Sequence, residues 1–311
     1  MSMDFFVILC IIKQKKGAYP MRDYLFLLFS VFLTTGDFAC NKLYQKKAGA
    51  SLVAGLLFNA MMGLFMGLIF LIPILIKGNY VLCTPYSLAM ACIATILVSA
   101  YNTIGFKIMK SGSMALYTMF LMTGGMLVPY VWGLFYLDEE FSLIRTAGLL
   151  MIIFAVFLAN YEKQKTNKKQ VLWCLLVFFF DGIVSIVSKS HQIEAVRPHV
   201  SAAEFVMLSG LCRFVLMGTL YLIVTKKTKS KPVKVRSVSG VVLGSAATSG
   251  LSYLLVLLGA KSIPVTVLYP LVTGGCMVIP ALVGVAFFKD KLTPRVAVSV
   301  AICFAATFMF L

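Results

Sequence analysis

Polar side chains recur at helical spacing inside two strongly apolar stretches of the chain. They are Thr34, Asp37, Asn41 and Gln45 in the first stretch, and Asp181, Ser185, Ser188 and Gln192 in the second. Steps of three or four residues put each set on one face of a helix. Because polar groups within a membrane span are costly, they usually face a hydrated interior. We expect both stripes to line one polar cavity; the alternative is hydrogen bonding between packed helices, without a solute.

Asp181 and Arg213 each lie near the middle of an apolar stretch. A charge at that depth costs about 3 kcal/mol on insertion scales unless it is paired or hydrated. One interpretation is a structural ion pair between these two residues. The other is that Arg213 binds a carboxylate or phosphate of a solute, while Asp181 releases the solute or titrates. Asp37 is a second candidate for proton coupling, and Tyr117 and Tyr269 are candidates for aromatic and hydroxyl contacts.

Residues that bind metals or perform catalysis do not cluster in the sequence. The eight cysteines stand singly without a CxxC pair, and most fall in apolar stretches, which is typical of buried small side chains. His191 and His199 are isolated, and no GxxxxGK[ST] motif is present. We therefore predict no metal, no cofactor and no enzymatic activity.

The elements that must position these residues are ten apolar blocks of membrane-spanning length. With 60% hydrophobic and 13% charged residues, the chain is far more apolar than a soluble domain, which is about half apolar and about a quarter charged. The net charge of +17 sits in short loops between the blocks, which argues against nucleic acid. We predict an all-α, multi-pass protein of the cell (plasma) membrane with spans at 24–44, 51–76, 86–106, 114–137, 143–161, 170–190, 203–225, 238–260, 264–288 and 294–311.

The two halves of the chain read as copies of each other. Adding 151 to residue numbers in the fourth block gives matching residues in the ninth, so that both contain Gly-x-Met-x-x-Pro-x-x-x-Gly. An offset of 147 relates the first block to the sixth, pairing Lys42 with Lys189 and Gln45 with Gln192. Because each copy has five spans, the second must be inverted, as in many transporters. Residues expected to allow close helix packing are Gly124, Pro129 and Gly133 in the first copy, and Gly275, Pro280 and Gly284 in the second.

Four segments follow from this division. We expect residues 1–20 to be a non-structural leader, because Phe5–Ile12 is too short to span and Met21 can serve as the start. Residues 21–161 and 170–311 are the two five-helix repeats, joined by a basic linker at 162–169. Ser142 and Thr293 are expected to be helix N-caps, Lys42 and Lys189 to reach toward lipid headgroups, and Gly63-x-x-x-Gly67 and Gly240-x-x-x-Gly244 to mark close packing.

The basic residues favour one orientation in the membrane. Loops after odd-numbered blocks hold most of them, including Lys46, Lys47 and the run Lys226–Arg236. The positive-inside rule therefore places these loops in the cytoplasm and both termini outside.

The duplicated element resembles the drug/metabolite transporter superfamily, specifically its EamA-like ten-helix branch. The carriers of the resemblance are Gly124, Pro129 and Glu139-Glu140-Phe141-Ser142 in the first half. In the second half they are Gly275, Pro280 and Asp290-Lys291-Leu292-Thr293, where Asp290 replaces the usual glutamate. The resemblance implies two five-helix repeats and transport of a small solute. It also implies cytoplasmic termini, against the charge count, so the orientation stays open.

The favoured function is secondary transport of a small metabolite by alternating access, the solute being an amino acid, a sugar or a related polar or amphipathic molecule. The alternative is a lipid or lipid-linked carrier flippase, and a membrane-embedded enzyme acting on lipid is less favoured. Expected partners are the solute, the bilayer and, as a further candidate, a coupling ion. The chain is expected to be a monomer or homodimer.

Overall fold

The computed structural model describes residues 20–49, 51–78, 81–110, 114–160, 168–228, 235–288 and 293–310, which are helical almost throughout. The leader 1–19, most of the linker (161–167) and Asp290 lie outside these ranges. The helices are α2 (Met21–Ala48), α3 (Leu52–Lys77), α4 (Pro85–Lys110), α5 (Met114–Tyr136), α6 (Leu143–Asn160), α7 (Lys168–Ile193), α8 (Ala202–Thr228), α9 (Val235–Gly259), α10 (Val265–Phe288) and α11 (Pro294–Thr307), followed by the 3-10 turn Phe308–Phe310.

Nine of the described helices, α2 to α10, are long and apolar enough to cross a membrane. The tenth predicted span is shorter, with 14 residues in α11. Several helices are longer than predicted because their basic ends remain helical: Lys46 and Lys47 belong to α2, and Lys168 and Lys169 belong to α7. The predicted N-caps are confirmed, since the Ser142 hydroxyl accepts from the Arg145 amide and the Thr293 hydroxyl from the Val296 amide, both at 3.4 Å.

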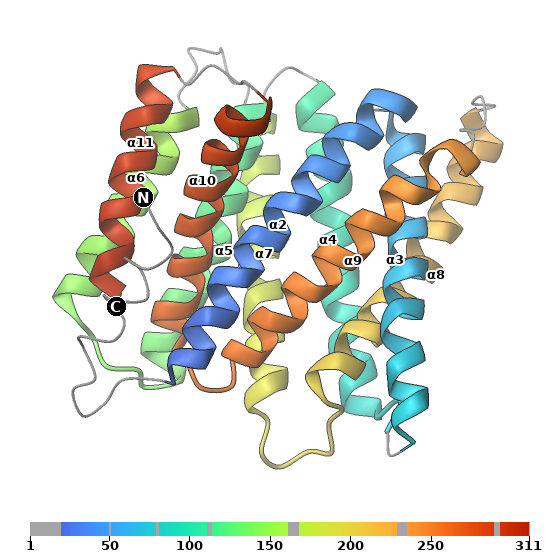
Figure 1. The fold of residues 1–311 in the computed structure, drawn as a ribbon, viewed down its shortest axis with the longest axis horizontal. Coiled ribbons are helices and arrows are strands. Elements are labelled where there is room, and N and C mark those ends of the chain that lie inside the picture. Colours follow the sequence, from blue (N-terminus) through green and yellow to red (C-terminus); the bar gives the residue numbers. More distant parts are fainter. Residues whose placement is uncertain are drawn as a thin grey trace.

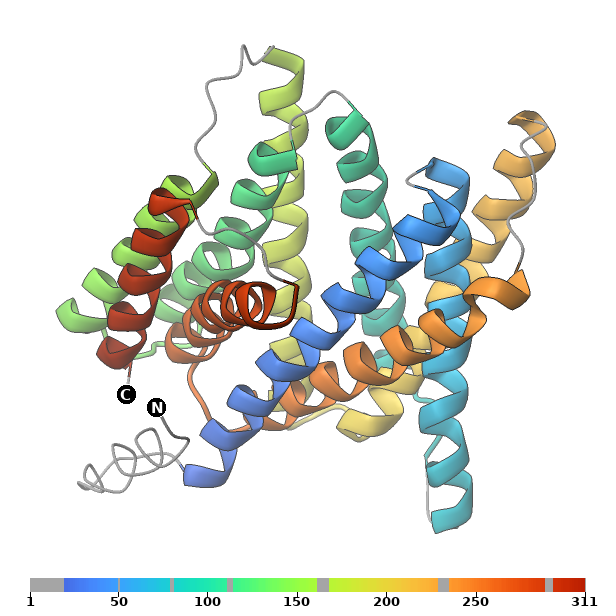
Figure 2. The ribbon, with the colours of Figure 1, turned by 45° about the horizontal axis from the view of Figure 1, so that its top comes forward.

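The helices pack mainly across the two halves of the chain. The principal neighbours are α2 with α9 and α10, α7 with α4 and α5, α3 with α8 and α9, α4 with α8, α5 with α10, and α6 with α11. Figure 1 shows α6 and α11 at one edge, α3 and α8 at the other, and α2 and α9 lying diagonally between them. Figure 2 shows α2 and α9 side by side in the turned view as well.

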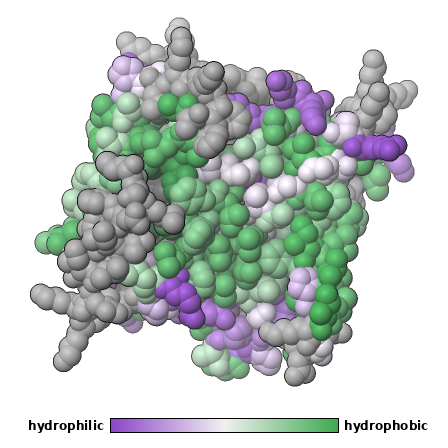
Figure 3. Space-filling model, in the orientation of Figure 1, coloured by the Kyte–Doolittle hydropathy of each residue, from purple (hydrophilic) through white to green (hydrophobic). Residues whose placement is uncertain are grey.

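Two large apolar clusters occupy opposite sides of the molecule. One is built mainly from α5, α6, α10 and α11, and the other mainly from α3, α8 and α9. On the outside, large apolar side chains such as Ile76 (81% exposed) and Phe135 (83%) face the surroundings. In the face that Figure 3 shows, hydrophobic residues cover most of the middle, and hydrophilic residues lie mainly toward its margins. This is the surface that a lipid environment requires.

Glycines mark the closest helix crossings. A Cβ on Gly63 would lie 2.6 Å from the Phe214 backbone nitrogen and 2.7 Å from the Gly210 oxygen, so the α3 and α8 backbones touch there. Gly240, by contrast, has no atom within 4 Å of such a Cβ, and its predicted role in close packing is wrong. In α9 only the second glycine of the pattern approaches another helix, since a Cβ on Gly244 would lie 3.4 Å from the Cys40 sulfur of α2, whereas both glycines of α3 contact α8 closely.

The first glycine of each Gly-Pro element packs against a helix that does not carry the other copy. A Cβ on Gly124 would lie 2.1 Å from the Phe178 oxygen on α7, and one on Gly275 would lie 2.9 Å from Val31 on α2. Gly133 faces Glu139 and Val265, while Pro129 and Pro280 lie within α5 and α10. The surroundings of Gly284 lie outside the described side chains. The glycines therefore seat α5 on α7 and α10 on α2.

Candidate functional site

The first predicted polar stripe lies against α9. The Thr34 and Ser252 hydroxyls are 2.8 Å apart, and Ser252 also donates to the Ser30 carbonyl at 2.8 Å. One turn further along, the Ser245 hydroxyl donates to the Asp37 carboxylate. Asn41 lies beyond these contacts, where its side-chain oxygen accepts a hydrogen bond from Gln45 at 3.1 Å. Thr34 and Asp37 thus join α2 to α9, whereas the hydrogen bond of Asn41 stays within α2.

The second stripe lies among α4, α5, α9 and α10. Tyr101 is the hydrogen-bond partner of the Asp181 carboxylate, and Tyr117 lies within electrostatic range of that carboxylate. The Ser185 hydroxyl donates to the Gly125 carbonyl at 3.3 Å, and its own carbonyl accepts from the Tyr269 hydroxyl at 2.5 Å. The Ser188 and Tyr253 hydroxyls, the latter on α9, are 2.8 Å apart. The structure therefore brings together Tyr117, Asp181, Ser185 and Tyr269 as one group.

Arg213 lies between the two stripes. Its Nη2 donates to the Asn59 side-chain oxygen at 2.5 Å, while Nε is buried without a partner among the described residues. Asp37 and Tyr101 lie within electrostatic range of the guanidinium. Of the two interpretations of Asp181 and Arg213, the ion pair is wrong: the described part of the chain has a single ion pair, Arg22 with Asp23 at 3.3 Å. Arg213 instead extends toward α3, and Tyr101 takes the Asp181 carboxylate.

These residues form a continuous polar seam between the two apolar clusters, consisting of Thr34, Asp37, Asn59, Tyr101, Tyr117, Asp181, Ser185, Ser188, Arg213, Ser245, Ser252, Tyr253 and Tyr269. Asp37, Asp181 and Arg213 are partly exposed although their contacts come from helices on several sides. The seam therefore holds one guanidinium and two carboxylates that are partly exposed, together with hydroxyls of which Ser188, Ser245 and Ser252 are buried. No three His, Cys, Asp or Glu side chains of the described residues are grouped to hold a metal ion.

At one end of the seam, the charged side chains of Asp23, Glu139 and Lys189 connect other segments of the chain to α10 and to the turn between α9 and α10. We call this the latched end. The Glu139 carboxylate accepts from the Val265 and Thr266 amides, at 2.7 and 2.9 Å, and so caps α10. Lys189 donates to the carbonyls of Ala260 and Ile263, at 2.5 and 2.8 Å. The expectation that Lys189 reaches the headgroups is wrong: its side chain is 4% exposed, because the turn between α9 and α10 supplies acceptors.

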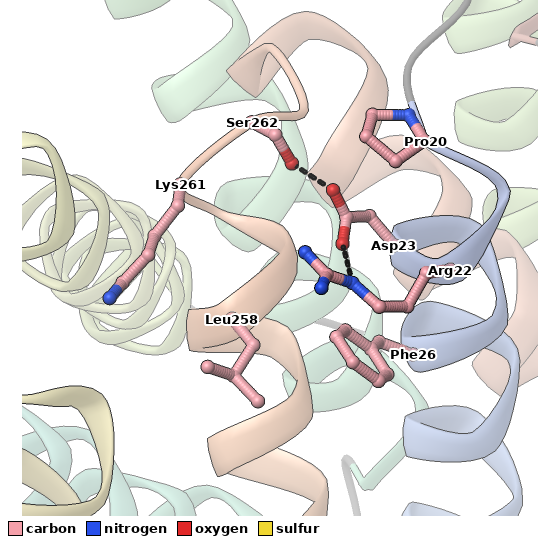
Figure 4. Close-up of a pocket in the computed structure, with 7 residues that line it drawn as sticks. All are labelled: Pro20, Arg22, Asp23, Phe26, Leu258, Lys261 and Ser262. Atoms are coloured by element: carbon pink, nitrogen blue, oxygen red, sulfur yellow. Dashed lines mark hydrogen bonds and ion pairs between the residues drawn. The ribbon is translucent and has the colours of Figure 1, made fainter.

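A pocket of about 450 Å³ lies at the same end, beside the start of α2 (Figure 4). Its buried Asp23 accepts a hydrogen bond from the Ser262 hydroxyl and pairs with Arg22. Lys261 lines the pocket but points away from Asp23. Asp23 thus ties α2 to the turn that Lys189 also holds.

A second, apolar pocket of about 210 Å³ lies between α2, α10 and α11. Leu27, Val31, Gly275 and Leu282 are among the residues that line it. Leu282 is 53% exposed, so this pocket reaches the outer, lipid-facing surface.

The two histidines come together in the structure, although their spacing gave no sign of it. His191 is buried, with Nε2 2.9 Å from the Ser87 hydroxyl, and its ring lies 5.6 Å from that of His199. In the following loop, the Val196 and Arg197 amides donate to the Glu194 carboxylate, which lowers the pKa of Glu194. These contacts order the loop between α7 and α8.

Several seam residues were missed by sequence reasoning. They are Asn59, Tyr101, Ser245, Ser252 and Tyr253, although Ser245, Thr248 and Ser252 of α9 have the same three- and four-residue spacing as the predicted stripes. Asn59 did carry a usable signal, since it is a lone polar residue deep in an apolar span. Cys92 and Cys212, which looked isolated, lie with their sulfurs 3.5 Å apart, on α4 and α8.

Comparison with known proteins identifies the fold. No family model matches the chain, and no curated protein matches it. A solved structure, described as "Crystal structure of protein", matches with a TM-score of 0.73 over 92% of this chain and 95% of that chain, at 18% sequence identity. At this identity the match shows a shared fold. The described part of the chain is thus all-helical, and nine of its helices are long and apolar enough to cross a membrane.

Proposed function

We propose that the protein is a secondary transporter, of the drug/metabolite transporter type, that moves a small polar or amphipathic solute across the plasma membrane. The observation that carries this proposal is the polar seam, in which hydroxyls, carboxylates and a guanidinium from both halves of the chain meet inside an apolar bundle. Burying so many polar groups is costly in a membrane protein. Binding of a polar solute by these groups explains why the chain keeps them inside the bundle.

The pattern of contacts supports a duplicated architecture. When the first five helices are exchanged for the last five, the principal neighbour pairs map onto each other: α2 with α9 becomes α7 with α4. Individual contacts follow the offsets of 147 and 151. Gly124 against Phe178 corresponds to Gly275 against Val31. Gly63 and Gly210, themselves equivalent, touch each other, as residues near a two-fold axis do.

The course of the chain also supports an inverted repeat. α2 and α7, the first helices of the two halves, run in opposite directions across the molecule in Figures 1 and 2. In such a transporter the two halves rock about a central site, so that it opens to one side and then to the other.

Uptake by reconstituted protein tests the proposal. Purified protein in liposomes is presented with labelled amino acids, sugars, organic acids and amines, and uptake is compared with that of empty vesicles. We expect at least one solute to accumulate, and Asp181→Asn to reduce its uptake about tenfold or more while the protein still purifies as a folded species. A folded protein that moves none of these solutes would contradict the proposal.

One observation favours a second candidate, a lipid or lipid-linked carrier flippase. The apolar pocket between α2, α10 and α11 reaches the lipid-facing surface, where an acyl chain has access to it. In that case the protein should move a fluorescent phospholipid between leaflets, and Gly275→Leu, which fills the pocket, should slow this movement. Solute uptake without lipid movement would favour the first candidate.

A further inference from the structure

We propose that the seam binds its solute through an oxyanion, a carboxylate or a phosphate, held by the guanidinium of Arg213. This inference rests on the proposed transport function and names the chemical class of the solute.

The first support is the incomplete hydrogen bonding of Arg213. A guanidinium has five N–H donors in a fixed plane. In the described part of the chain, the donated bond goes from Nη2 to Asn59, and the buried Nε has no acceptor. A buried charged donor without an acceptor is unfavourable. The paired oxygens of a carboxylate or phosphate match the spacing of guanidinium donors and remove this penalty.

The second support is charge. Neither seam carboxylate is within 4.0 Å of Arg213, so no described acidic group forms an ion pair with it. The Asp37 carboxylate accepts from Ser245, and the Asp181 carboxylate is bonded to Tyr101. Asp37 lies within electrostatic range of the guanidinium and so reduces the cost of the buried cation, while no described carboxylate occupies its donors.

The third support is the rigidity of the position. Asn59 donates to the Gly55 carbonyl at 2.8 Å, which fixes the oxygen that holds Nη2. Asn59 and Arg213 lie within one helical turn of Gly63 and Gly210, where the α3 and α8 backbones touch. The guanidinium is therefore anchored from two helices at their closest approach, which is the preorganisation that a binding group needs.

Thermal unfolding of the purified protein tests this inference. The probes are acetate, succinate and glycerol 3-phosphate, each compared with its uncharged counterpart: acetamide, succinamide and glycerol. We expect at least one anion at millimolar concentration to raise Tm by about 2 °C or more, because a ligand of the folded state stabilises it. The uncharged counterpart should have no effect. Succinate and glycerol 3-phosphate distinguish a carboxylate site from a phosphate site.

Three variants locate the effect. Arg213→Gln should abolish the anion-dependent shift, and Arg236→Gln, which removes an exposed arginine of α9, should retain it. Asn59→Asp places a carboxylate beside Nη2 of Arg213. This carboxylate should form an ion pair with the guanidinium and so take the place of the anion. The variant should keep or raise the Tm of the protein without ligand and lose the response to anions. This variant decides the question even where Arg213→Gln does not fold.

The outcomes separate this inference from the transport function. Wild-type protein that responds to none of the three anions, or an anion response that survives in Arg213→Gln and Asn59→Asp, would overturn the oxyanion site. Uptake of an uncharged solute that is unaffected by Arg213→Gln would also overturn it and would leave the transporter intact. Absence of uptake for every solute, with binding of an anion retained, would contradict transport alone.

Discussion

Gly125 decides where the Asp181 carboxylate can lie. A Cβ added to Gly125 would be 2.3 Å from Asp181 Oδ2, so the carboxylate occupies the space that any side chain at this position would fill. We expect Gly125→Ala to displace the carboxylate from Tyr101 and to lower solute uptake about tenfold, which corresponds to about 1.4 kcal/mol of lost interaction. Initial uptake rates in liposomes, normalised to the amount of folded protein, measure this effect.

Gly218→Ala is the matched control for this prediction. A Cβ at Gly218 would meet no atom within 4 Å, and the residue lies inside α8. Alanine there should leave uptake unchanged and stabilise the helix by up to about 1 kcal/mol. If Gly125→Ala transported at the wild-type rate, the Asp181 carboxylate would not need its present position.

For single residues, the sequence predicted which polar side chains share a helix face, but not which residues they form hydrogen bonds with. The three- and four-residue spacing of Thr34, Asp37, Asp181 and Ser185 is visible in the chain and places them on shared helix faces. Which hydroxyl meets which carboxylate depends on how each helix is rotated against its neighbour. For this reason the sequence could not decide between the two interpretations of Asp181 and Arg213, and the ion pair among them was wrong.

Among the helices, the crossing of α3 and α8 is held by small residues. We expect Gly63→Ala to lower the free energy of unfolding by about 1 to 3 kcal/mol, because its Cβ would overlap backbone atoms of α8 that cannot move aside. Thermal unfolding in detergent measures the change. Gly240→Ala, at a glycine with open space around it, is the control and should not lower Tm. Equal effects of the two variants would show that helix propensity, and not close packing, governs both sites.

The cap that Glu139 forms on α10 gives a second prediction for the helices. Its carboxylate accepts two amide hydrogen bonds and one from the Thr266 hydroxyl at 2.7 Å. We expect Glu139→Gln to destabilise the protein by about 1 to 3 kcal/mol, since a neutral amide replaces a charged acceptor at a helix N-terminus. Glu140→Gln, which changes an exposed neighbour, should have little effect on the same thermal unfolding curve. If the Glu139 cap does not stabilise the protein, the thermal unfolding curves of Glu139→Gln and Glu140→Gln will be alike.

The helices themselves were largely predictable, because apolar blocks of spanning length set them directly. Their ends were less so: Lys46 and Lys47 continue α2, although basic pairs looked like a break. The latched end was not foreseen either. Its contacts join Glu139, Lys189 and Asp23 to a turn far away in sequence, and such long-range partners leave no local pattern.

Over the whole molecule, residues that the sequence pairs as equivalent have different surroundings. Lys189 and Gln192 are buried at the latched end, at 4% and 6% exposure. Lys42 and Gln45, related to them by the offset of 147, are exposed at the opposite end, which also carries most of the basic loops. Two copies of one unit would have equal surroundings in a symmetric state. The difference supports a conformer packed at the latched end and looser at the basic end.

Alternating access predicts that this asymmetry reverses during transport. Single thiols are introduced as Gln45→Cys and Gln192→Cys into protein whose native cysteines have been replaced and whose uptake is retained. Without solute, we expect a water-soluble maleimide to label position 45 readily and position 192 slowly, as their exposures indicate. With a transported solute present, labelling should fall at position 45 and rise at position 192, because packing at one end accompanies opening at the other. A solute that is not transported is the control and should change neither rate. If the two rates never move in opposite directions, the latched end is a fixed part of the fold and the halves do not rock about the seam.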